Sequence, residues 1–129
     1  MAPTPDLRAT LLAAWRTNNR VTIHLVGNLP VGLWNASVPG APRRTVRTIA
    51  VHLHNARSRW LKTLGQEHGI PVPALVDLRR VARRELMSAL ERSSRGIEAL
   101  LELGIAAGGQ VTDGLWQWTT RVREWRGAR

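Results

Sequence analysis

Residues 7–30, LRATLLAAWRTNNRVTIHLVGNLP, decide the fold class of this chain. Their apolar side chains recur at steps of three or four residues, the spacing that places side chains on one face of an α-helix. The stripe consists of Leu7, Leu11, Ala14 or Trp15, Val21 or Thr22, Leu25 and Leu29, with Asn18 inside it. Pro30 ends the helix because it lacks an N–H donor and clashes with the preceding turn. We therefore predict a helix over residues 5–29 with this stripe facing a core.

The same periodicity recurs later in the chain, and no segment shows the sustained alternation of a strand. A second helix is predicted over 45–65, capped by Thr45, and a third over 77–104, capped by Asp77. A weaker helix is predicted over 115–126, and the Pro- and Gly-rich residues 30–43 form a connector with Trp34 packed beneath it. The predicted fold class is all-α: one domain over 1–129, an antiparallel up-down helical bundle with a shortened or atypical fourth helix.

Composition and charge limit the classes of function. The chain has 129 residues and a formal net charge of +10, and it contains no Cys, which excludes disulfides and thiolate metal ligands. No apolar run reaches the ~20 residues that a spanning helix needs. No signal-peptide pattern opens the sequence, so we expect a cytoplasmic protein with no membrane partner. A surface of this charge attracts phosphates, acidic metabolites or nucleic acid, although a basic face can also be merely solvated.

The histidines are the main candidates for metal ligands. His52 and His54 lie on the predicted second helix, where residues two apart point about 200° away from each other and so do not reach one metal. His52 is predicted at the edge of the buried face and His54 toward solvent. His24 lies at the edge of the first stripe, and His68 lies near the end of the second helix. A lone histidine at a bundle edge is also compatible with simple packing or exposure.

Motifs for other chemistry are missing. The sequence contains no Ser-His-Asp order, no phosphate-binding glycine loop, no HExxH and no Cys/His finger. Glu98 and Glu102 form an i,i+4 carboxylate pair on the third helix. A di-metal bundle site requires several inward carboxylates and an ExxH motif, which this sequence lacks. We therefore predict that both carboxylates are solvated.

Residues 45–61, TVRTIAVHLHNARSRWL, resemble the second helix of the DinB/YfiT-like superfamily, a helix with a His followed eight and nine positions later by Trp-Leu. Upstream, Asn18-Asn19-Arg20, Leu29-Pro30, Leu33-Trp34 and Pro39-Gly40 are similar to the family's opening helix and loop. Residues 77–93 are similar to its third helix. The resemblance covers about residues 7–103.

The resemblance implies a four-helix bundle, commonly dimeric, that holds a divalent metal such as zinc or nickel with three histidines. His52 matches the ligand from the second helix. The other two ligands form an HxxxH pair on the last helix, and this chain has no histidine after His68. Because a catalytic zinc typically keeps three protein ligands, we expect metal binding to be weak or absent. His24 and Asn18 are the nearest replacements.

Three functions follow from these observations. The first is a DinB-like bundle with a degenerate, incomplete metal site, and the second is a metal-dependent transferase or isomerase that acts on a thiol or another small molecule. The third is a basic helical protein that binds nucleic acid, to which the second helix region would contribute Arg43, Arg44, Arg47, Arg57 and Arg59. We also predict a homodimer, because either Ile97, Leu100 and Leu101 or the Trp118 and Trp125 face requires a covering surface.

Overall fold

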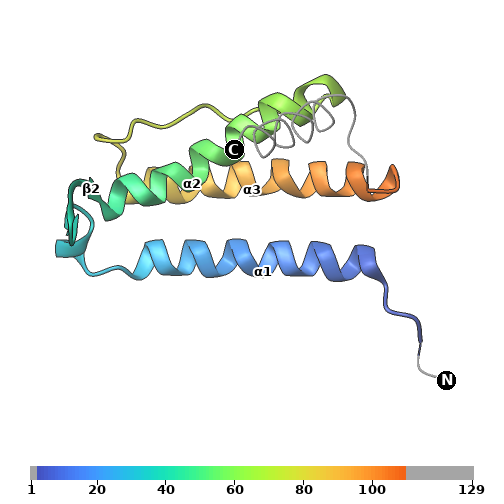
Figure 1. Ribbon diagram of the computed structural model, residues 1–129, viewed down its shortest axis with the longest axis horizontal. Coiled ribbons are helices and arrows are strands. Elements are labelled where there is room, and N and C mark those ends of the chain that lie inside the picture. The colour runs from blue at the N-terminus through green and yellow to red at the C-terminus, as the bar shows by residue number, and fades with distance from the viewer. Residues whose placement is uncertain (1–2, 110–129) are drawn as a thin grey trace, which may run out of the picture.

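Three long helices dominate the computed structural model, which describes residues 3–109 (Figure 1). They are α1 (Leu7–Asn28), α2 (Val46–Trp60) and α3 (Arg83–Ala106). The short elements are the 3₁₀ turns η1 (Val31–Leu33) and η3 (Gln66–His68), the π-helical turn η2 (Leu61–Gly65), and the strands β1 (Ser37–Val38) and β2 (Ala41–Thr45). The predicted helical bundle is thus confirmed for this part of the chain, whereas the helix predicted over 115–126 lies outside the described residues.

The helix ends follow local chemistry. The Asp6 side chain accepts a hydrogen bond from the Ala9 N–H at the start of α1, and Thr45 and Thr48 form a reciprocal capping box at the start of α2. Leu29 and Pro30 are extended, so α1 ends where Pro30 was predicted to end it. The predicted connector contains a small antiparallel hairpin of β1 and β2, and Trp34 beside it is buried as predicted.

The third helix begins later than predicted. The Asp77 carboxylate does accept backbone N–H bonds from Arg79 and Arg80, but these bonds close an isolated turn. Ala82 is extended, and α3 begins at Arg83. The interruption lets Val81 point into the core, where it is 3% exposed, so burial of one apolar side chain outweighs the continuation of the helix.

The helix order also differs from the predicted up-down arrangement. Arg8 near the start of α1 pairs with Glu102 near the end of α3, so these two helices are antiparallel. Leu61, directly after α2, packs in one cluster with Leu100 of α3, so α2 and α3 run in the same direction. The connecting segment therefore returns along the whole bundle (Figure 1). Residues 69–82 are long enough, since an extended chain of that size spans up to about 46 Å.

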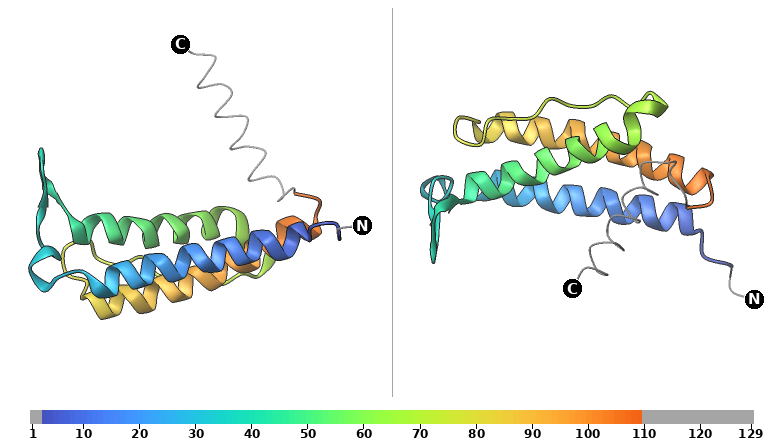
Figure 2. Two further views of the ribbon diagram at one scale, coloured as in Figure 1. Left: turned by 90° about the horizontal axis from the view of Figure 1, so that it is seen from below. Right: turned by 45° about the horizontal axis from the view of Figure 1, so that its top comes forward.

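α3 packs against both α1 and α2 and so links the other two helices, and Figure 2 shows the three helices running side by side. One core cluster lies toward the hairpin and contains Val51, Leu86 and Leu90, all with no exposed surface. The other cluster joins Leu61 and Leu64 to Leu100, with Ile97 packed against it. Leu100 is therefore buried within the chain, whereas Ile97 and Leu101 are half-buried, and the Trp118 and Trp125 face lies outside the described residues.

The predicted stripe of α1 coincides only in part with the face that packs on α3, since Trp15 donates to the Ser94 carbonyl and Leu29 packs against the core. Leu12, Asn19 and Val26 are the buried residues of α1, whereas Leu7 and Val21 of the predicted stripe are 68% and 61% exposed. Helix α1 carries two rows of mainly apolar residues, and within the described chain only one of them has a neighbour. No helix within residues 3–109 is both long enough and apolar enough to cross a membrane.

Candidate functional site

The two histidines of α2 point in the reverse of their predicted directions. His52 is exposed, whereas His54 has no exposed surface. The Nε2 of His54 lies 2.9 Å from the Ala74 carbonyl oxygen, and because a carbonyl only accepts, this nitrogen carries the proton. The prediction that His54 faces solvent was therefore wrong. The metal role of His52 stays a prediction.

Asn55 explains why polar residues of α2 are buried. Its Nδ2 donates to the Val76 carbonyl at 3.2 Å, and its Oδ1 accepts from the Val76 N–H at 3.0 Å. The segment around Ala74 and Val76 is extended and lies against a helix, so side chains must satisfy its backbone groups. His54 and Asn55 do so, and we call this pair of contacts the α2 clasp.

Burial keeps His54 neutral. Burial lowers the pKa of His54 below its ordinary value of 6.5, and the positive charges of Arg92 and Arg57 lower it further. Hydrogen bonding to the Ala74 carbonyl opposes these effects without outweighing them. A neutral, packed imidazole that holds a backbone segment has a structural role.

Arg57 lies where the three helices meet. Its Nη1 donates to Asn19 Oδ1 on α1 at 2.9 Å and to the Leu90 carbonyl on α3 at 3.2 Å, and its guanidinium lies 4.8 Å from the Trp15 ring centroid. Burial lowers the pKa of this guanidinium. Arg57 is only 9% exposed, so its predicted place on a ligand-facing basic surface was wrong.

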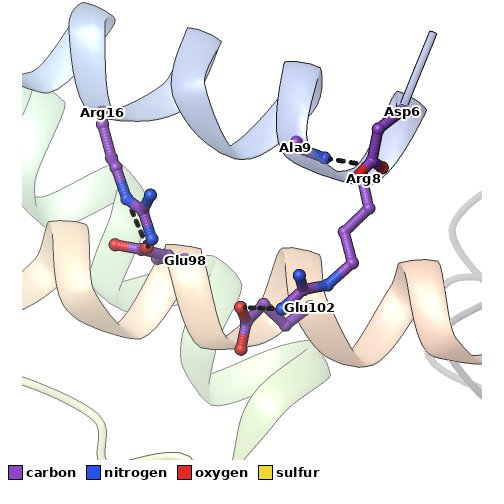
Figure 3. Close-up of polar contacts among 6 residues, drawn as sticks. All are labelled: Asp6, Arg8, Ala9, Arg16, Glu98 and Glu102. Carbon is purple, nitrogen blue, oxygen red and sulfur yellow. Dashed lines mark hydrogen bonds and ion pairs between the residues drawn. The ribbon is translucent and has the colours of Figure 1, made fainter. Parts of the chain in front are cut away.

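Glu98 and Glu102 are paired with arginines of α1 (Figure 3). Arg16 Nε donates to Glu98 Oε1 at 2.7 Å, and Arg8 Nη2 donates to Glu102 Oε1 at the same distance. The prediction that both carboxylates are simply solvated was therefore incomplete. Both pairs remain open to water; Arg8–Glu102 joins the start of α1 to the end of α3, and Arg16–Glu98 joins the two helices nearer their middle.

The opposite end of the bundle gathers arginines from three segments. Arg43 and Arg44 lie on β2, Arg79 and Arg80 on the turn after Asp77, and Arg84 in the first turn of α3, and all five are exposed. Arg43, Arg44 and Arg79 line one shallow groove together with Thr48 and Leu78. We call the five exposed arginines, Arg43, Arg44, Arg79, Arg80 and Arg84, the cationic end. Figure 1 shows the hairpin and the start of α3 at the same end of the molecule.

The Asp77 carboxylate lies among these arginines, and Glu91 lines the same hollow as Arg84. Asp77 uses its carboxylate to accept the backbone N–H groups of Arg79 and Arg80, which lowers its pKa. Arg83 is turned inward, over the Trp34 ring and toward the Gly27 carbonyl. The Arg8–Glu102 pair lies at the far end of the bundle and the Arg16–Glu98 pair near the middle of α1. The sequence displays the individual arginines, but their convergence depends on the long return of the chain before α3.

The described chain is thus a mainly helical bundle with a strongly cationic end. No protein-family model, curated protein or solved structure matches it. The resemblance to the DinB/YfiT-like superfamily therefore stays a prediction carried by the sequence motifs quoted above.

We expect purified protein to contain less than one zinc or nickel per chain, because His52 supplies one of the three ligands that such a site needs. Among residues 3–109 no three His, Cys, Asp or Glu side chains gather as a metal-binding group. Elemental analysis measures the content, and His52→Ala should remove what metal there is, whereas His68→Ala should not. One metal per chain that disappears in His52→Ala would contradict this expectation and favour the metalloenzyme.

Proposed function

We propose that this protein binds nucleic acid through the phosphate backbone, using the cationic end. The observation that carries the proposal is that five exposed arginines from β2, the turn after Asp77 and the start of α3 lie at one end of the bundle (Figure 1), three of them along one groove. Nucleic acid presents a dense row of phosphates, and neutralising them releases condensed counterions, which is favourable at moderate salt.

Arginine is suited to this contact. Its planar guanidinium donates two parallel N–H bonds to phosphate oxygens and stays charged at any physiological pH. Arg43 and Arg44 lie on β2 between Ala41 and Thr45, the two residues that pair with β1, and the Arg79 N–H donates to Asp77, so both segments are anchored before a ligand arrives. Less ordering of the backbone on binding leaves more of the interaction energy for affinity.

The spread of the charges favours a polymer over a small acidic metabolite. Arg43, Arg44 and Arg79 line the groove beside β2, whereas Arg84 lines a separate hollow with Ile23 and Met87. A small ligand needs donors that converge on one point, whereas successive phosphates need donors that are spaced apart. Contacts with phosphates carry no base information, so the proposed binding is independent of sequence.

We expect the double variant Arg79→Glu/Arg80→Glu to bind a short DNA duplex at least about tenfold more weakly than the natural chain at physiological salt, because two phosphate contacts become repulsions. The slope of log affinity against log salt should become shallower by about 2. Fluorescence anisotropy over a salt series measures both quantities.

Arg59→Glu/Lys62→Glu is the matched control, since it changes the charge equally at exposed positions on the last turn of α2 and in η2, far from the hairpin. This control should change the affinity less than the first variant does. Equal losses in the two variants would mean that net charge alone attracts the duplex. Either that result or no salt-dependent binding by the natural chain would refute the proposal.

A further inference from the structure

A row of exposed residues runs along α1 on the side that α3 does not cover. Leu7, Leu11, Val21 and Leu25 are 68%, 41%, 61% and 61% exposed. Ala14 and Asn18, also exposed, complete the row. The steps along it are four, three, four, three and four residues, which is the 3.5-residue repeat of a helix that pairs with another helix.

The spacing of the residues in this row is the same in both directions along the helix. Leu7 and Leu25 each lie nine residues from position 16, Leu11 and Val21 each lie five, and Ala14 and Asn18 each lie two. A second copy of α1 laid antiparallel about position 16 therefore sets Leu7 against Leu25 and Leu11 against Val21. Such a surface is self-complementary, as a two-fold dimer requires.

The centre of the row fits the same arrangement. Ala14 of one copy would face Asn18 of the other, so the small methyl group leaves room for the amide. The two Asn18 residues would lie about 6 Å apart along the axis, within reach of each other's amides. A single Asn within an apolar helix seam commonly specifies the register of pairing.

We infer that two copies of this chain associate through α1, antiparallel, about a two-fold axis beside position 16. Parallel pairing would bring two cationic ends together, with Arg43, Arg44, Arg79, Arg80 and Arg84 of each copy repelling those of the other. Antiparallel pairing places the cationic ends at opposite ends of the dimer. The inference is independent of the proposed nucleic-acid binding, because the row and the cationic end share no residue.

The first test is the oligomeric state of the full chain by light scattering at micromolar concentration. We expect twice the chain mass of 14.4 kDa. Val21→Glu should raise the dissociation constant at least about 100-fold, because each dimer would bury two unpaired carboxylates. Val31→Glu is the matched control. Val31 is 88% exposed in η1, outside the row, so the dimer should persist.

The second test is disulfide crosslinking, which is clean because the chain has no Cys of its own. In Leu7→Cys/Leu25→Cys the facing sulfurs of an antiparallel dimer come close enough to bond, so oxidation should give covalent dimer. In Leu7→Cys alone the two sulfurs would lie about 27 Å apart along the axis, and no covalent dimer should form.

Three outcomes would overturn the inference. A monomeric natural chain would mean that another segment or another protein covers the row, or that nothing does. A dimer that survives Val21→Glu would place the interface elsewhere. Covalent dimer from Leu7→Cys alone would mean that the helices pair in parallel. Circular dichroism that matches the natural chain confirms that each variant is folded.

Discussion

Gly96→Leu should lower the free energy of unfolding by about 3 kcal/mol, near the upper end of the usual cost of overfilling a packed core. A Cβ atom at Gly96 would lie 2.5 Å from Leu61 Cδ1 and 3.2 Å from Leu61 Cδ2. Leu61 has no exposed surface, so its side chain has no solvent-filled space to enter. Leucine favours a helix over glycine by only about 1 kcal/mol, so the clash decides the sign. Urea denaturation measures the change.

Gly32→Leu is the control for this substitution. A Cβ at Gly32 meets nothing within 4 Å, and we expect a change within about 0.5 kcal/mol. A double variant isolates the contact: Leu61→Ala should cost less in the Gly96→Leu background than in the natural chain, because it then relieves the clash. Natural stability in Gly96→Leu would show that α3 and the turn after α2 do not approach this closely.

Acidification should destabilise the protein through His54. The pKa of His54 in the folded protein lies below its ordinary value of 6.5, mainly because the side chain is buried. Below about pH 6.5 the unfolded chain therefore binds a proton that the folded chain excludes. By proton linkage the free energy of unfolding then falls by up to about 1.4 kcal/mol per pH unit, until the pH reaches the folded pKa. Urea denaturation between neutral and mildly acidic pH measures this slope.

His54→Gln tests the assignment, because glutamine keeps an amide donor and has no titratable group in this range. The variant should be less stable at neutral pH, where the fit to the Ala74 carbonyl is lost, and its stability should depend less on pH below 6.5. His52→Gln, at an exposed position two residues away, should keep the natural pH dependence. Equal slopes for the natural chain and His54→Gln would contradict the role of the clasp.

Local sequence signals placed the helices well and oriented α1 and α2 poorly. Thr45 caps α2 and Pro30 follows the end of α1, as predicted, because capping and the missing proline donor act within one turn of the chain. In α2 the predicted orientation failed at polar residues. His54 and Asn55 are buried because an extended segment some twenty residues later needs hydrogen-bond partners. Apolar periodicity contains no information about such a partner.

The sequence by itself determined the helical class, the net charge of +10 and the lack of disulfides. Only the tertiary structure decided that the row of Leu12, Asn19 and Val26 packs on α3, while the row of Leu7 and Val21 stays exposed. It also decided that α3 starts beside the hairpin, which brings Arg79, Arg80 and Arg84 to Arg43 and Arg44. The physical reason is that helical spacing fixes which side chains share a face, whereas burial of a face depends on the surface that meets it.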